Sequence, residues 1–142
     1  MKIWVSVCDS SRLRLFQADK PNDQLHEISD KYHGASRERE RELVTDRPGV
    51  AHGRGQTHTL ADENDQHKEE AAQFAREVAD VLNRGALDSK YTKLYILAPP
   101  AFLGHLRKQL SEHTRKLVAE EIPVNLTKET ADHIRRQLGE YL

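Results

Sequence analysis

The chain has 142 residues, of which 37% are hydrophobic and 32% are charged, and its formal net charge is −1. This length fits one ordinary domain with a modest core, and the near-zero charge excludes a global field that would draw the protein to nucleic acid or an anionic membrane. Cys8 is the only cysteine, which excludes an internal disulfide and a thiolate metal cluster. Its apolar neighbours predict a small core residue.

Three strands are predicted before residue 34. The apolar run KIWVSVCD, residues 2–9, ends in a turn signal, and RLRLFQA, residues 12–18, alternates leucine with arginine. Because period-two alternation of this length is typical of a half-buried strand, we expect these two segments to pair as a hairpin. After a turn over 19–23, the alternation in QLHEISDKYH, residues 24–33, predicts a third strand.

A long loop is predicted over residues 34–64. No apolar period appears there, and Pro48 with several glycines opposes regular structure in its second half. A loop of this length inside a compact domain is uncommon and is usually either functional or disordered. This segment is therefore the first place to look for a functional site.

Helices and strands alternate after the loop. Residues 65–84 place apolar side chains at helical spacing, with acids in the first turns and Gly85 just past the end. The apolar run stopped by two prolines predicts a buried central strand at 93–98. A helix over 101–110 follows, and we expect its Gly104 to allow close packing against a neighbour.

The end of the chain predicts one more strand, RKLVAEEIPV at 115–124, and an amphipathic helix at 128–141 with Thr127 as N-cap. The order βββ–loop–αβαβα predicts an α/β layer fold with a mixed sheet, in which the first three strands form an antiparallel meander. Residues 1–142 are expected to form a single domain. The predicted core comprises Ile3, Val5, Val7, Leu13, Leu15, Phe74, Val78, Leu94, Ile96, Leu103, Leu106, Val118, Ile122, Ile134 and Leu138.

The stretch HGRGQTH, residues 52–58, presents Gln56 on a turn that two glycines permit. No acidic residue lies between Arg47 and His58, and the arginine guanidinium suits phosphate because its planar fork binds two oxygens. The segment is therefore either an RNA-contacting tip or a solvated loop with ordinary surface charges.

Other candidate sites are weaker. His52, His58 and His67 share one region, but their spacing fits no zinc template, so no metal site is predicted. The chain lacks Walker and Rossmann glycine-rich loops, and we expect no cofactor. A second basic stretch is either an auxiliary RNA-facing patch or solvated surface; its members are Arg107, Lys108, Arg115 and Lys116.

Several motifs resemble the bacterial host-attachment protein family. They are CDSSRLRLFQ at 8–17, LVTDRPG at 43–49, FAREVADVL at 74–82, LAPPAFLGHLRKQL at 97–110 and EIPVNLTK at 121–128. The family's sequences in turn resemble the middle domain of archaeal and eukaryotic class-1 peptide-chain release factors. The resemblance implies an α/β fold of the same element order with RNase H-like layering, and a Gly-Gly-Gln loop before the long helix.

That loop gives Gln56 a candidate role. Gly55 and Gln56 match its second glycine and its glutamine, whereas Arg54 stands at the position of the first glycine. In release factors this glutamine enters the peptidyl-transferase centre and helps to place the water that cleaves peptidyl-tRNA, so the resemblance implies that Gln56 and Gly55 are catalytic. Alternatively, the Gly-Gln pair is a coincidence in a polar loop. The residues expected to contact nucleic acid are Arg47, His52, Gly53, Arg54 and His58.

Three functions follow from these observations. The first is a translation-associated protein that resembles a stand-alone release-factor middle domain and acts on the ribosome or on peptidyl-tRNA. The second is an interaction protein required for attachment to host cells, and the third is a non-catalytic RNA-binding module. The N-terminus has no signal-peptide pattern and the chain has no apolar run of about 20 residues, so we expect a cytoplasmic protein without membrane insertion.

Overall fold

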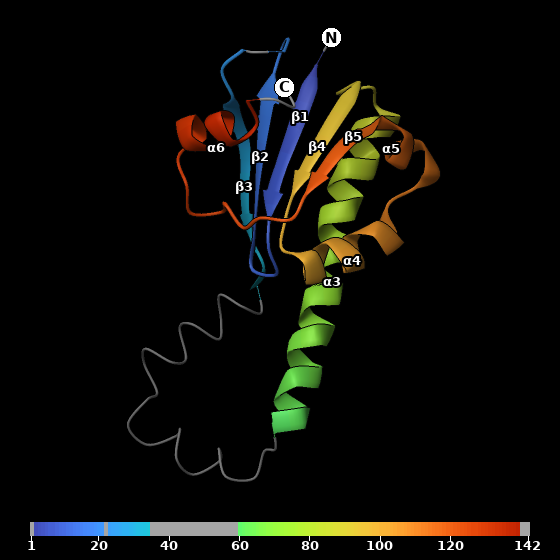
Figure 1. Cartoon of the computed structure of the whole chain (residues 1–142). Coiled ribbons are helices and arrows are strands. Elements are labelled where there is room, and N and C mark those ends of the chain that lie inside the picture. The colour runs from blue at the N-terminus through green and yellow to red at the C-terminus, as the bar shows by residue number, and fades with distance from the viewer. Residues whose placement is uncertain (1, 22, 35–59, 140–142) are drawn as a thin grey trace.

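The computed structural model describes residues 2–21, 23–34 and 60–139, and for 60–66 it describes the backbone alone. A five-stranded sheet in the order β3-β2-β1-β4-β5 has helices on both faces, which confirms the predicted α/β class with a mixed sheet (Figure 1). The strands are β1 (Ile3–Cys8), β2 (Arg12–Ala18), β3 (His26–Tyr32), β4 (Lys93–Leu97) and β5 (Val118–Ile122). The helices are α3 (Leu60–Leu87), α4 (Pro100–Gln109), α5 (Glu112–Leu117) and α6 (Ala131–Gln137).

The sheet combines an antiparallel and a parallel half. β1 pairs antiparallel with β2, and β2 with β3, which confirms the N-terminal meander. On its other side β1 pairs parallel with β4, and β4 with β5. Every residue of β1 is buried because the strand is central and covered on both faces. The same position explains why its sequence is a continuous apolar run.

Helices α3, α4 and α5 cover one face of the sheet. Phe74, Val78 and Leu82 of α3 share a buried cluster with Phe102 and Leu106 of α4 and with alternate residues of the central strands. Near the C-terminal end of α3, the rings of Trp4 and Tyr91 lie 4.6 Å apart between centroids. Apolar side chains therefore pack most of this face, and the buried Ser6 hydroxyl lies 3.7 Å from Cys8 Sγ.

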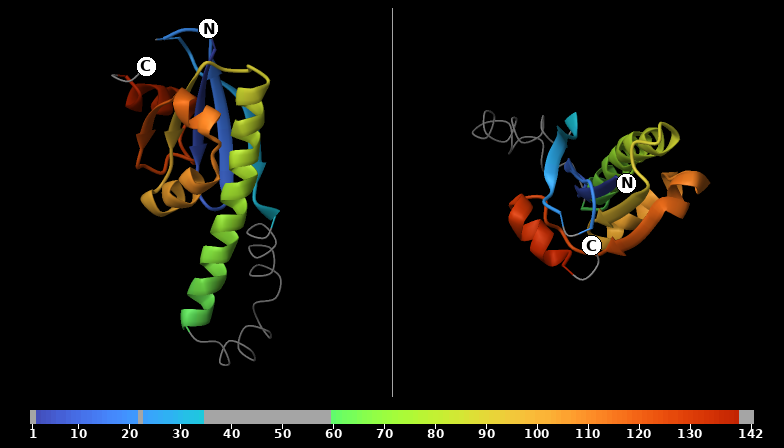
Figure 2. Two further views of the ribbon diagram at one scale, coloured as in Figure 1. Left: turned by 90° about the vertical axis from the view of Figure 1, so that its right-hand side faces the viewer. Right: turned by 90° about the horizontal axis from the view of Figure 1, so that it is seen from above.

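Helix α6 covers the opposite face (Figure 2). Ile134 and Leu138 pack with Val5, Phe16 and Leu97 in a second, smaller cluster. The predicted core is confirmed at every position except Val118 and Ile122, which are only partly buried because β5 is an edge strand. The two leucines of β2 and its two arginines lie on opposite faces, as the alternation predicts.

Helix α3 is longer than the expected 65–84. It begins at Leu60, so the predicted loop 34–64 is wrong in its last residues, and it continues past Gly85 to Leu87. Gly85 lies inside the helix and packs directly against the Trp4 ring. A side chain does not fit there, because a Cβ added at Gly85 would lie 2.6 Å from Trp4 Cζ3. The glycine that reads as a stop signal is therefore a close-packing residue.

Three expectations near the C-terminus are wrong in detail. The strand predicted for 115–124 begins only at Val118, because Ser111 caps the short helix α5 by accepting a hydrogen bond from the Thr114 amide. The last helix starts at Ala131 with Thr130 as N-cap, not Thr127, and ends at Gln137. A Cβ added at Gly104 would meet nothing within 4 Å, so close packing does not explain this glycine.

The N-terminal part of α3 extends past the end of the sheet, as Figures 1 and 2 show. The strands β1, β4 and β5 all run towards that same end. The expected exposure of 45–60 falls almost wholly on residues outside the described part of the chain. The described fold thus places the start of α3 beside the carboxyl ends of the three parallel strands.

Candidate functional site

A pocket of about 340 Å³ lies where the parallel strands end, and we call it the strand-end pocket. Asp9 and Ser10 directly follow β1, Pro99 follows β4 within two residues, and Asn125 follows β5. Ligands of open α/β sheets gather at this end, since the loops after the strands diverge there. The position makes the pocket the candidate site, although it is not the largest hollow of the molecule.

Two helices complete the walls of the strand-end pocket. His67, Lys68 and Ala71 come from the first turns of α3 beyond the sheet, and Phe102 and His105 come from α4. The rings of Phe102 and Phe74 lie 6.1 Å apart between centroids, which fixes α4 against α3. The pocket therefore has an apolar side at Phe102 and Ala71, and a polar rim.

Asp9 holds the turn on which the pocket is built. Its Oδ1 accepts hydrogen bonds from the amides of Ser11 and Arg12 at 2.8 and 2.9 Å. Its Oδ2 accepts from Asn125 Nδ2 and Thr127 Oγ1, both at 3.1 Å. Because four donors occupy the carboxylate, Asp9 ties the β1–β2 turn to the segment after β5.

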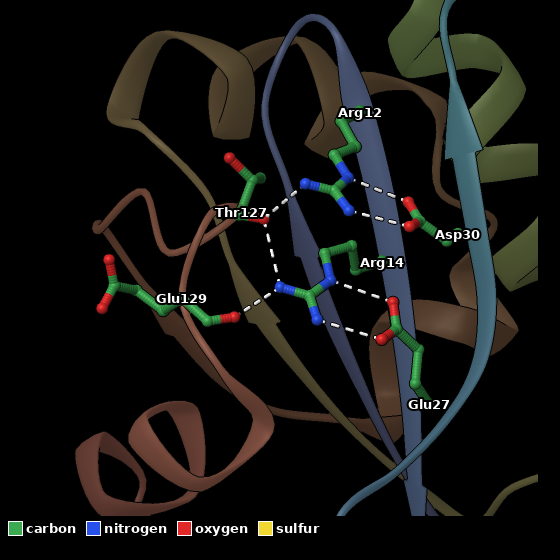
Figure 3. Close-up of polar contacts among 6 residues, drawn as sticks. All are labelled: Arg12, Arg14, Glu27, Asp30, Thr127 and Glu129. Atoms are coloured by element: carbon green, nitrogen blue, oxygen red, sulfur yellow. Dashed lines mark hydrogen bonds and ion pairs between the residues drawn. The ribbon is translucent and has the colours of Figure 1, made fainter.

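Two arginines fix that segment from the other side (Figure 3). Arg12 donates hydrogen bonds from Nε and Nη2 to the Asp30 carboxylate at 2.9 and 2.8 Å. Arg14 donates from its own Nε and Nη2 to the Glu27 carboxylate, both at 2.9 Å. The Nη1 atoms of both arginines donate to the carbonyl oxygen of Thr127 at 3.0 and 3.1 Å. The hydrogen bond with Asp30 raises the pKa of Arg12, and it lowers the pKa of Asp30.

A buried histidine lies behind the pocket. His33 is 3% exposed, its ring lies 5.0 Å from that of Phe74, and its amide donates to Ser11 O. Neither ring nitrogen forms a hydrogen bond with the described residues, although Nδ1 lies 3.4 Å from Glu77 Oε2. The histidine therefore acts here as an aromatic packing residue between β3 and α3.

The described residues show no pair of nucleophile and base at this site. The Cys8 thiol is buried, and burial raises its pKa to about 12, which confirms the predicted core role. Among the residues that the structure describes, no group of three His, Cys, Asp or Glu side chains is arranged to hold a metal ion.

A larger hollow of about 700 Å³ lies between α4, α5 and β5. It brings together Arg107, Lys108 and Arg115 of the second predicted basic stretch. However, Arg107 Nε bonds Glu121 Oε1 at 2.6 Å, and Arg115 Nη2 bonds the Arg107 carbonyl oxygen at 2.6 Å. Since acids and engaged arginines share the groove, its charge is mixed.

The predicted site falls outside the described residues. Arg47, His52, Gly53, Arg54, Gly55, Gln56 and His58 all belong to 35–59, so their roles stay predictions. His67, considered above only as a metal ligand, lines the strand-end pocket. Sequence reasoning missed Ser10, Lys68 and His105. The position of Ser10 at the end of a strand was a usable signal. Lys68 and His105, by contrast, reach the pocket only through the tertiary packing of their helices.

None of the helices in the described part of the chain is long and apolar enough to cross a membrane. This finding agrees with the absence of any long apolar run in the sequence.

Comparison with known proteins gives a family match over most of the chain. The profile of a family described as "Protein required for attachment to host cells" matches residues 4–138. The protein RP470 of Rickettsia prowazekii (strain Madrid E), which is named as uncharacterized, is 27% identical over 141 residues that cover 93% of this chain and 89% of its own.

Among solved structures, the type II variant of the Aquifex aeolicus Ppx/GppA phosphatase matches with 14% identity and a TM-score of 0.37. The match covers 87% of this chain and 36% of that one.

Proposed function

Because the chain belongs to the family of proteins required for attachment to host cells, we propose that it is an interaction protein that serves such attachment. We assign the contact to the end of the domain that holds the strand-end pocket. One observation carries this assignment: the carboxyl ends of β1, β4 and β5 and the projecting start of α3 lie at the same end. A pocket where the loops after parallel strands meet is a usual setting of ligand binding.

The surface chemistry of this end fits a binding role. His67 and Lys68 are exposed on α3, and the apolar side chains of Ala71 and Phe102 lie next to them in the pocket wall. Polar side chains around a small apolar floor give a ligand both orientation and contact area. Asp9 and Arg14 hold the walls in place, so the pocket is preformed.

Attachment assays with a gene deletion test this proposal. Cells that lack the gene receive the unaltered gene, a Lys68→Glu/Ala71→Arg double variant, or a Lys90→Glu variant as a matched control. The double variant reverses one charge and fills the pocket. Lys90 is exposed near the opposite end of α3. We expect the double variant to restore little attachment to host cells and the control to restore all of it. Equal restoration by both variants would remove the pocket from the attachment role.

A second candidate is the translation-associated role, with Gln56 and its basic neighbours as the RNA-contacting tip. It is favoured by one feature, since the segment that contains Gln56 rejoins the described fold at Leu60, the far end of the projecting α3. Sedimentation with ribosomes in low and high salt tests it. The variants Gln56→Ala and Arg54→Gly then separate peptide release from a non-catalytic RNA-binding module. Absence of the protein from ribosomal fractions at every salt concentration would exclude both.

A further inference from the structure

The size of the strand-end pocket selects the kind of ligand that it takes. Its volume of about 340 Å³ falls within the range of small-molecule sites, which is roughly 300–1,000 Å³. Secondary-structure elements bound it on several sides, with α3 and α4 as walls and the turn after β1 at the edge. A compact group fits such a hollow better than an extended polymer does.

The charge of the lining favours an anion. Lys68 from α3 and His105 from α4 reach the pocket from two sides, and neither forms a hydrogen bond or ion pair with the rest of the described chain. The hydroxyl of Ser10 adds a neutral donor at the edge. Among the described residues of the lining, Asp9 is the one carboxylate, and its oxygens already accept four hydrogen bonds. A cation that prefers carboxylate ligands would therefore find no open carboxylate oxygen among these described residues.

The start of α4 adds to this preference. Pro99, Ala101 and Phe102 line the pocket, and no side chain of the described residues caps this helix. The first turn contains no acidic residue, so the positive end of the helix dipole is not neutralised locally. Pro100 has no amide hydrogen, which leaves the amides of Ala101 and Phe102 as the first donors.

We propose that the strand-end pocket binds the phosphate group of a small phosphate monoester, with Lys68 as its charged contact and the His105 ring as a further hydrogen-bond donor. A tetrahedral dianion presents oxygens in several directions, and these donors approach from α3, α4 and the Ser10 turn. The net charge of −1 supplies no global field that would draw in a nucleic-acid backbone. The proposal rests on the proposed function for the location of the site, and it adds the chemical class of the ligand.

A titration followed by amide NMR tests the proposal on the full chain. Inorganic phosphate and glycerol phosphate are added at constant ionic strength, and the amides of Ala101 and Phe102 are monitored. We expect saturable shifts and a Lys68→Ala variant with about tenfold weaker affinity, the loss that corresponds to one charge-assisted hydrogen bond. The matched control Lys108→Ala removes an exposed lysine of α4 that lines the other groove, and its affinity should change less than about twofold.

Three results would overturn the proposal: no saturation at these amides, equal losses in Lys68→Ala and Lys108→Ala, or binding of a short RNA without binding of either phosphate. Because Lys68 is exposed, the variant is expected to fold normally, and thermal unfolding checks this. If the unaltered protein binds phosphate but the pocket variants attach normally, only the attachment role is refuted. Attachment that depends on the pocket, without phosphate binding, would refute the ligand alone.

Discussion

The face of the sheet under α3 and the face under α6 are covered in different ways. Under α3, Phe74 and Leu82 belong to a continuous apolar cluster, and Gly85 lets the helix approach Trp4 closely. Under α6, the apolar cluster is smaller, and the segment that leads into the helix is held by the paired guanidinium groups of Arg12 and Arg14. One helix is fixed by shape, and the other by a smaller apolar cluster together with hydrogen bonds to the segment before it.

This contrast bears on where function is located. A helix fixed by shape resists displacement along its whole packed length, so the projecting start of α3 has a firm base. The hydrogen-bonded segment before α6 contributes Asn125 to the strand-end pocket and joins Asp9 through Thr127. The pocket thus has one wall set by apolar packing and one set by polar contacts, and substitutions should separate the two.

The largest effect is expected at Gly85. A Gly85→Val substitution makes the new side chain overlap the Trp4 ring, because even a Cβ would lie 2.6 Å from Cζ3. We expect this overlap to destabilise the protein by about 3 kcal/mol. Gly104→Ala is the matched control, since nothing lies within 4 Å of its added Cβ, and it should stabilise by about 0.5–1 kcal/mol. Urea unfolding measures both. Equal signs for the two variants would contradict packing by shape under α3.

The polar face should respond next. Arg14→Ala removes the partner of Glu27 and the donor to the carbonyl oxygens of Thr127 and Glu129, so we expect a loss of about 2 kcal/mol in the free energy of unfolding. Arg84→Ala is the control, because its i,i+4 pair with Asp80 is solvent-exposed and should contribute about 0.5 kcal/mol or less. Similar losses in both would mean that the arginines under α6 act as ordinary surface pairs.

A smaller effect is expected at the joint between the two walls. Thr127→Val keeps the shape of a buried side chain and removes the hydroxyl that bonds Asp9 and Asn125, at a cost of about 1 kcal/mol. Thr92→Val removes an exposed hydroxyl 3.3 Å from the Lys2 carbonyl oxygen and should change stability little. Thermal unfolding of the pair decides whether the joint contributes to stability, and no difference between them would show that it does not.

The smallest effect is a dependence on pH. The pKa of Asp30 is lowered in the folded state by Arg12, so the stabilisation from this pair is present above the usual carboxyl pKa. It is lost as the pH falls through the lowered value. The stability difference between wild type and Asp30→Asn should therefore shrink in acid, in unfolding curves measured from neutral pH downwards. A difference that grows in acid would reverse the assigned direction.

The sequence predicted the parts of the fold that repeat a local period. The alternation in β2 and the apolar runs of β1 and β4 identify strands because burial on one or both faces leaves a direct pattern. Gly85 and Thr127 were misassigned, since their roles depend on Trp4 and Asp9, partners more than 80 residues away along the chain. A local pattern carries no information about such partners.

The strand-end pocket was predictable only in part. Its contributions from Asp9 and Asn125 follow from the strand ends, because parallel strands direct the residues after them to one edge. Lys68 and His105 belong to helices whose rotation is set by packing, and nothing in their own sequence neighbourhood distinguishes them from other surface residues. The Gly-Gln stretch around Gln56, chosen from its composition and the family resemblance, stays a prediction.

The parallel pairing of β1 with β4 joins Ile3 to Lys93, so the chain must close a loop of 90 residues to form the centre of its sheet. The entropy of loop closure grows only with the logarithm of loop length, and ten residues added between β3 and α3 would cost about 0.1 kcal/mol. Evolution can therefore lengthen, shorten or rewrite that connection almost without effect on stability. Relatives that bind different partners should differ most there, while the sheet that holds both ends changes slowly.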